Sequence, residues 1–326
     1  MSWPVLSYGV VSPGGMGVDA LSRPWLPTAT QSADGTRRHT AFLVDREAPD
    51  LKRSQREPRL RRASPLSSYL LEAARQALEA APGVDRKKTG VVASLFLGCL
   101  VYSIRFYRQL TEDGRRFASP LLFPETVFNS PLSHVVTTLG LGGPVYSQVG
   151  DTSSWATALR TADCWLTNGS AEHVLVLGAE EFEPHALDAF HAAGFFRKPT
   201  AVSEGAGALL LSREGPGVAL MGVADGYAFH SRNAANGAAT RCLRNFSEEI
   251  PILDTAVGWT RTIKIPPDRP VVENLVANPC LAGTAAFAWD TILAAEILKN
   301  SAAPKSLVIP YWGHTHQCAA AHLARP

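Results

Sequence analysis

A short turn at residues 150–154 carries side chains that could take part in catalysis. Asp151, Thr152 and Ser153 follow an apolar run at 145–149 and precede a helical pattern. This spacing predicts a strand, a tight turn and a helix, with Thr152 at the helix N-terminus, where unpaired N–H groups favour negative charge. Thr152 could act there as a nucleophile with Asp151 as its base. The simpler interpretation is that both residues cap the helix, a common role for Asp and Thr.

The cysteines and histidines give weaker signals. The five cysteines are scattered and none forms a CxxC pair, which is typical of reduced, buried thiols in a cytosolic protein. Cys280 has no histidine or lysine close in sequence to activate it, so we expect a structural thiol. His314 and His316 form a His-x-His pair without a nearby carboxylate, which is a weak metal signal. We therefore expect no metal site, and we interpret these histidines, like His134 and His322, as core or surface residues.

The turn lies within a β-α-β pattern, with strands at 145–149 and 173–178 around a helix at 153–167. Such a unit implies parallel strands in an α/β fold, with helices on both faces of the sheet. Further strands are expected at 5–11, 90–97, 206–212, 218–224 and, as the last one, 306–309. Helices are expected at 17–26, 64–81, 100–112 and 284–299, and an exposed loop at 44–63.

Composition restricts the possible functions. The 326 residues suffice for one large or two medium domains, and 46% hydrophobic against 18% charged residues indicates a large core or a large interface. A net charge of +2 is too small to indicate nucleic-acid binding. No uncharged apolar run reaches the roughly 18 residues of a membrane span, and residues 1–11 do not resemble a signal peptide. We expect a cytoplasmic protein.

Four stretches, in the same order, resemble the β-ketoacyl synthase family. Residues 203–211 (SEGAGALLL) are similar to the family's Gly-Glu-Gly-Ala-Gly strand, and residues 9–18, 66–92 and 129–144 resemble the units that precede it. The resemblance implies a thiolase-like fold, a five-layered α-β-α-β-α sandwich of two similar halves that is normally dimeric. Here the halves would be residues 1–215 and a shortened 216–326, folded as one integrated unit.

The family's reaction needs a cysteine thiolate at a helix N-terminus and two histidines that assist decarboxylation and stabilise the enolate. The resemblance places Thr152 at the cysteine, Val257 at the first histidine and Cys280 at the second. The family's lysine has no counterpart at 273–278. We therefore expect no catalytic residues at these positions, no activity from the chain alone, and no cofactor.

Such losses are similar to those of chain-length factors, the β subunits of type II polyketide and polyene systems. These proteins lack the cysteine and pair with an active ketosynthase, although Gln rather than Thr often replaces the cysteine. The resemblance implies a heterodimer whose interface strand consists of Val145, Tyr146, Ser147, Gln148 and Val149. The partner's acyl tunnel would end at this interface.

Two other stretches are assigned roles in such a complex. The apolar and aromatic run 99–107 contains Tyr102 and Phe106, which we expect to limit product length; an amphipathic core helix is the alternative. Arg59, Arg61 and Arg62 would attract an acidic acyl carrier protein, with a solvated loop as the alternative.

Two other functions remain open. The chain could be an active thiolase-fold acyltransferase or hydrolase that uses Thr152, Cys280 or Cys164 as a displaced nucleophile. It could also be a homodimeric scaffold without an acyl channel, which would bind no ketosynthase.

Overall fold

Strand β1 (Trp3–Ser12) joins the two parts of one long ladder of strands in the computed structural model, which describes residues 2–195, 200–300 and 302–325. The start of β1 pairs with β10, and the rest pairs antiparallel with β9. From β9 the order continues through β7 and β5 to β6; from β10 it continues through β15, β14 and β12 to β13. Each end of the ladder therefore has one edge strand.

The bounds of these strands follow the apolar runs of the sequence. The first part contains β5 (Thr89–Leu95), β6 (Val145–Val149), β7 (His173–Glu180) and β9 (Gly205–Ser212). The second contains β10 (Ala219–Val223), β12 (Ile252–Leu253), β13 (Val271–Val272), β14 (Ser306–Trp312) and β15 (Gln317–Ala324). Strands β2 (Gly15–Met16) and β11 (Tyr227–Ala228) attach to β1 and β15.

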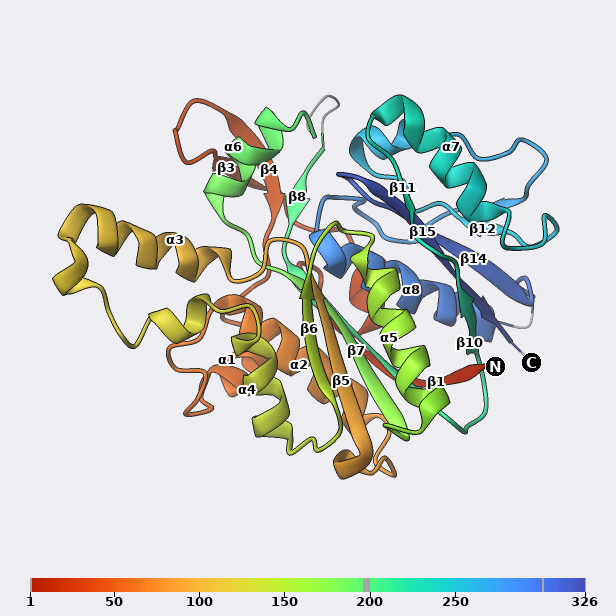
Figure 1. The fold of residues 1–326 in the computed structure, drawn as a ribbon, viewed down its shortest axis with the longest axis horizontal. Coiled ribbons are helices and arrows are strands. Elements are labelled where there is room, and N and C mark those ends of the chain that lie inside the picture. Colours follow the sequence, from red (N-terminus) through yellow and green to blue (C-terminus); the bar gives the residue numbers. More distant parts are fainter. Residues whose placement is uncertain (1, 196–199, 301, 326) are drawn as a thin grey trace.

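Helices separate and cover the two parts of the ladder (Figure 1). Between them lie α5 (Ser154–Asn168) and α8 (Gly283–Lys299), which contact strands of both parts. Outside the first part lie α2 (Pro65–Glu79) and α4 (Ser130–Leu139), and outside the second lies α7 (Arg232–Leu243). The five-layered sandwich expected from the sequence is present.

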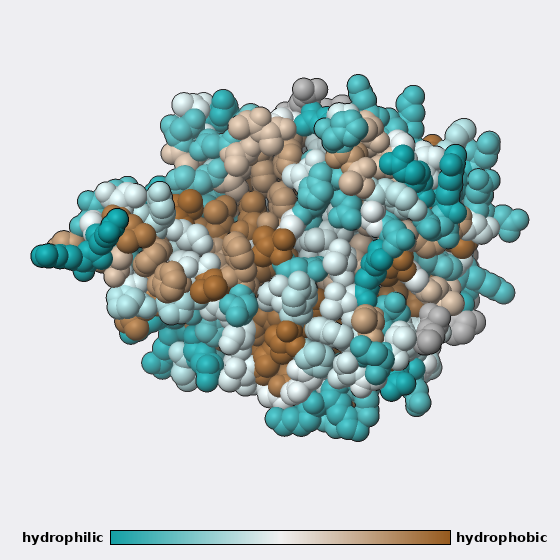
Figure 2. Space-filling model, viewed as in Figure 1, coloured by the Kyte–Doolittle hydropathy of each residue, from teal (hydrophilic) through white to brown (hydrophobic). Residues whose placement is uncertain are grey.

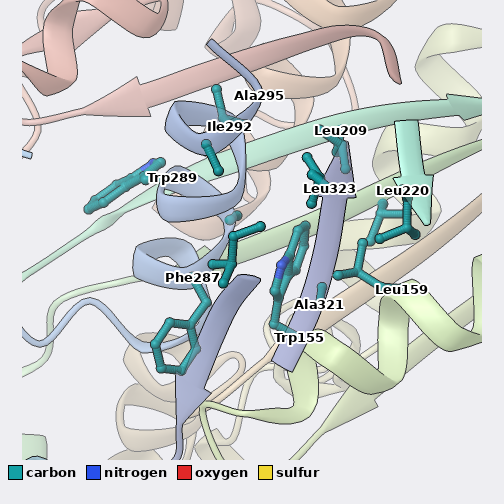
Figure 3. Packing of buried hydrophobic residues seen from close by; sticks show 14 of the residues in the cluster. Trp155, Leu159, Leu209, Leu220, Phe287, Trp289, Ile292, Ala295, Ala321 and Leu323 are labelled. Atoms are coloured by element: carbon teal, nitrogen blue, oxygen red, sulfur yellow. The ribbon is translucent and has the colours of Figure 1, made fainter. Parts of the chain in front are cut away.

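The middle helix layer forms the largest core (Figure 3). Helix α8 is apolar around most of its circumference, as expected for a helix buried between two sheets. The indole N–H of Trp289 donates to the carbonyl of Ala206 at 2.9 Å, and that of Trp155 donates to the hydroxyl of Thr291 at 2.9 Å. Both bonds fix α8, one to β9 and the other to α5. The core residues labelled in the figure are Trp155, Leu159, Leu209, Leu220, Phe287, Trp289, Ile292, Ala295, Ala321 and Leu323.

A smaller unit covers one end of the sandwich. Strands β3 (Thr28–Gln31), β4 (Arg38–Phe42) and β8 (Val202–Ser203) form a separate sheet beside α6 (Pro184–Ala192). Helix α3 (Leu100–Arg108) extends away from the body as an arm (Figure 1). The remaining short turns are η1 (Val18–Leu21), η2 (Arg86–Lys88), η3 (Gln109–Asp113), η4 (Arg115–Phe117), η5 (Phe123–Thr126) and η6 (Gly258–Thr262).

Three expectations from the sequence are wrong. The stretch 44–63 is not simply an exposed loop, because it contains helix α1 (Pro49–Gln55) and buries Leu51 and Leu60. Only a short turn, η1, forms within 17–26. Strand β14 is not the last one, since β15 follows it and pairs with it along its length.

No helix in the described part of the chain is long and apolar enough to cross a membrane.

Candidate functional site

Thr152, Val257 and Cys280 line one cavity of about 30 Å³. Thr152 lies in the turn between β6 and α5, Val257 directly precedes η6, and Cys280 lies shortly before α8. Thr152 is only 2% exposed. The cavity has room for about two water molecules. The structure therefore brings the three positions together, but around a space too small for an acyl chain.

The Asp151 carboxylate binds the loop that follows β14. It accepts hydrogen bonds from the backbone N–H groups of His314 at 3.1 Å, Thr315 at 2.9 Å and His316 at 2.8 Å. It also accepts one from the N–H of Ser153 at 3.1 Å, as a helix cap would. Burial alone would raise the pKa of Asp151, but these bonds and the Thr315 hydroxyl lower it below its usual value. A permanent anion thus occupies a cluster of backbone donors next to Thr152.

His314 lines the site, although from the sequence it was interpreted only as a core or surface histidine. Its ring is buried, and Nδ1 lies 3.3 Å from Oγ1 of Thr152, whose hydroxyl is also 3.1 Å from Oδ1 of Asp151. Burial lowers the pKa of His314 to about 4, against the opposing effect of Asp151. The imidazole is therefore neutral at pH 7. Its Nε2 is buried without a hydrogen-bond partner among the described residues.

Cys280 and Asp290 also line the cavity, and both are buried. Burial raises the pKa of the Cys280 thiol to about 12, so the thiolate is scarce at neutral pH. Burial also raises the pKa of Asp290 to about 7, although the side-chain amide of Asn274 donates to its Oδ1 at 2.7 Å. Cys280 in this environment is a structural thiol, as its sequence context suggested.

A second cavity of about 20 Å³ adjoins the first, and Thr152 and Gly283 line both. It contains Glu180, whose Oε2 accepts from the N–H of Leu97 at 3.2 Å and whose Oε1 is buried without a partner among the described residues. Burial raises the pKa of Glu180 to about 8. The rings of Phe96 and Phe190 stack beside it at 5.8 Å between centroids. Side chains therefore fill the space around Thr152 from this direction too.

Strand β6 pairs with β5 in parallel register from Val91 opposite Val145 to Leu95 opposite Val149. Its other edge meets no strand in the described structure. The side chains of Val145 and Tyr146 are 48% and 51% exposed. Hydrophobic surface gathers over this middle region of the molecule and beside the α3 arm (Figure 2).

The expected gate residues lie apart from Thr152. Tyr102 lines a surface pocket together with Arg61 and Arg62, and Phe106 packs against Phe123 with 5.5 Å between ring centroids. No residue of α3 is buried, so the alternative of a core helix is wrong. Arg59 lies outside that pocket and is exposed, as are Arg61 and Arg62.

The other candidate nucleophile, Cys164, lies outside this cavity, as do His134 and His322. Cys164 is exposed on α5, unlike the other four cysteines, and all five are free thiols. His134 contacts Glu125 at 3.0 Å, and His322 belongs to β15. Among the described residues, no group of three or more His, Cys, Asp or Glu side chains could hold a metal ion.

Comparisons with known proteins agree with this architecture. The family model "Beta-ketoacyl synthase, N-terminal domain" matches residues 11–216. The ishigamide ketosynthase/chain length factor is similar in structure, with a TM-score of 0.78 and 20% identity over 100% of this chain and 99% of that chain. No curated protein sequence matches the chain.

Two other solved structures are similar over nearly the whole chain. One is a type II PKS acyl-carrier protein in complex with its ketosynthase bound to the hexaketide (AntDE:AntF), with a TM-score of 0.73 and 17% identity over 99% of each chain. The other is a β-ketoacyl synthase from Burkholderia phymatum, with a TM-score of 0.75 and 14% identity over 100% of this chain and 99% of that chain. These similarities confirm the thiolase-like fold.

Proposed function

The chain belongs to the β-ketoacyl synthase family, and from that premise we propose that it is a non-catalytic subunit, a chain-length factor, that pairs with an active ketosynthase. The observation that carries the proposal is the cavity of about 30 Å³ bounded by Thr152, Val257 and Cys280. It contains neither an activated thiolate nor space for an acyl chain. Asp151 already occupies backbone donors beside it, which could otherwise stabilise a developing oxyanion.

Strand β6 supports the pairing. An edge strand with open backbone groups and exposed Val145, Tyr146 and Val149 favours association with another chain. We infer that the corresponding strand of a ketosynthase pairs with β6, and that Ser147 and Gln148 also enter the interface. The partner's acyl tunnel would then end against this subunit, beside Phe106 and Tyr102 on α3.

The exposed arginines support a contact with an acyl carrier protein. Arg59, Arg61 and Arg62 lie together between α1 and α2 without an ion pair among the described residues. Reversing these charges to Glu should slow turnover of the complex at low carrier concentration, because electrostatic attraction mainly raises the association rate. Unchanged turnover at low carrier concentration would argue against the contact.

Co-expression with ketosynthases, starting with any encoded beside this chain, tests the pairing. We expect a stable one-to-one heterodimer by native mass, in which a radiolabelled acyl group is found only on the ketosynthase subunit. A ketosynthase whose catalytic cysteine is replaced by alanine should still pair but should carry no label. A clean homodimer that binds no ketosynthase would refute the proposal and favour the scaffold function.

The contact between Thr152 and His314 favours a second candidate function, an acyltransferase or hydrolase. A neutral imidazole 3.3 Å from a hydroxyl is placed to accept its proton. Intact-mass measurement after incubation with acyl-pantetheine thioesters would reveal an acyl-threonine, and Thr152→Val would remove it. We expect no adduct on the isolated wild-type chain, because the small cavity and Asp151 leave no place for the thioester.

A further inference from the structure

A pocket of about 350 Å³ outside the cavity around Thr152 gathers three arginines. Arg61 and Arg62 enter it from the turn before α2, and Arg105 enters from α3. No acidic side chain lines the pocket. Among the described residues, none of the three guanidinium groups forms an ion pair, although Arg75 and Arg46 elsewhere do.

The pocket is built from segments that hold one another in place. The hydroxyl of Tyr102 donates to the carbonyl of Ala63 at 3.2 Å, which ties α3 to the arginine-bearing turn. The guanidinium of Arg105 lies 5.9 Å from the centre of the Tyr102 ring. The side chain of Gln109 accepts from the N–H of Ser119 at 3.1 Å, which ties together two segments that line the pocket.

Three cations that share a pocket repel one another, and a bound anion would remove that cost. Guanidinium groups match the oxygen geometry of phosphate particularly well, because each presents a planar fork of donors. A tetrahedral phosphoryl group has enough oxygens for three arginines, whereas a carboxylate has two. Tyr102, Leu121 and Leu122 also give the pocket an apolar wall, which suits an attached organic group.

We propose that Arg61, Arg62 and Arg105 bind a phosphoryl group carried on an organic molecule. The phosphate has two possible sources: the phosphopantetheine arm of a carrier protein, or a free phosphorylated metabolite. Only the first source rests on the function proposed above. The anion site itself is a property of the isolated chain, and it can be tested there.

Calorimetric titration of the purified chain tests the site. We expect saturable binding of 4′-phosphopantetheine, weaker binding of inorganic phosphate, and no binding of pantetheine, which lacks the phosphate. Arg62→Ala/Arg105→Ala should weaken phosphopantetheine binding at least tenfold, since it removes two of the three guanidinium groups that would hydrogen-bond the phosphoryl oxygens. The matched control is Arg115→Ala/Arg116→Ala, which removes two charges from exposed arginines outside the pocket and should bind as wild type.

An equal loss of phosphopantetheine affinity in the two double variants would indicate general charge attraction and overturn the proposal. Unchanged affinity in Arg62→Ala/Arg105→Ala would also overturn it, as would pantetheine binding as tightly as phosphopantetheine. Apo and holo carrier proteins then identify the source. Tighter binding of the holo form assigns the pocket to the carrier's arm, and equal binding assigns it to a free metabolite. A chain that binds phosphopantetheine but no ketosynthase would refute the proposed function alone.

Discussion

At the scale of single residues, the carboxylate of Asp151 and the imidazole of His314 occupy the volume beside Thr152. Asp151 ties the loop at 314–316 to the start of α5 through three backbone N–H groups. His314 then fills volume beside Thr152, with its ring also 5.6 Å from that of Phe195. The hydrogen bonds of Asp151 occupy the backbone N–H groups, and the ring of His314 occupies the volume, that a substrate would otherwise use.

The buried imidazole of His314 should make stability depend on pH. The pKa of His314 in the folded state is about 4, against 6.5 for an ordinary histidine. Its contribution to the free energy of unfolding is therefore complete above pH 6.5 and is lost as the pH falls towards 4. Between pH 7 and 5 this loss amounts to about 2 kcal/mol. Urea unfolding of wild type and His314→Gln should show a shallower acid-side decline in the variant. If the stability of the two proteins changed with pH in the same way, the lowered pKa of His314 would be contradicted.

Glu180 should have the opposite pH dependence. The pKa of Glu180 in the folded state is raised to about 8 from 4.5. Its contribution to the free energy of unfolding is therefore complete below pH 4.5 and is lost as the pH rises towards 8. Glu180→Gln keeps the shape and removes the titration. The variant should therefore gain stability relative to wild type between pH 5 and 8, by about 3 kcal/mol. A constant difference across that range would show that the carboxyl does not titrate there.

At the scale of elements, α8 begins where a glycine is required. Gly283 has φ +53°, and a Cβ atom there would lie 2.1 Å from Oε2 of Glu180. Gly283→Ala should cost at least about 2 kcal/mol, since the left-handed conformation alone costs about 1–2 kcal/mol. The matched control is Gly237→Ala inside α7, where a Cβ meets only the tip of Arg241 at 3.7 Å, and which should be neutral or stabilising in urea unfolding.

Strand β6 offers a second test at this scale. Val149→Lys should abolish co-purification with the ketosynthase, because it places a charge on an edge strand that must become buried. The isolated chain should lose no more than about 0.5 kcal/mol, as for other exposed substitutions. Val271→Lys is the control, since Val271 is an exposed valine on the ladder's other edge strand, β13. Equal co-purification of the two variants would place the interface elsewhere.

The sequence predicted those elements whose signals are local. The helix at 64–81 was recognisable from Ser64 and Pro65, and it forms as α2. Strand β15 was missed because its Ala-rich middle, 319–321, lacks β-branched residues. The grouping of Thr152 with Val257 and Cys280 was predictable only through the family resemblance. The contact with His314 was not, because it joins residues 162 positions apart without a local pattern.

At the scale of the whole molecule, the features that favour contact with another molecule lie on surfaces away from the cavity around Thr152. The open edge of β6, the α3 arm and the arginine pocket all present groups that a single chain leaves unburied. By contrast, the interior around Thr152 is closed by side chains from both halves of the ladder. This distribution is what a subunit needs if it contributes walls and contacts to another protein's reaction.

The gate proposed for α3 belongs to this scale, because it acts only when a partner's acyl tunnel reaches the surface of this chain. Phe106 packs against Phe123, which is itself 56% exposed, so the pair can form a wall that the partner covers. In the heterodimer, Phe106→Ala should lengthen the principal product, measured by mass spectrometry of the released chains. Tyr107→Ala, a neighbouring exposed aromatic on the same helix, should leave product length unchanged. Because Phe106 is not buried, the isolated variant should keep the wild-type unfolding midpoint, so a lengthened product would reflect the wall and not a weakened fold. Products of wild-type length from Phe106→Ala would refute the gate while leaving the pairing of the two subunits intact.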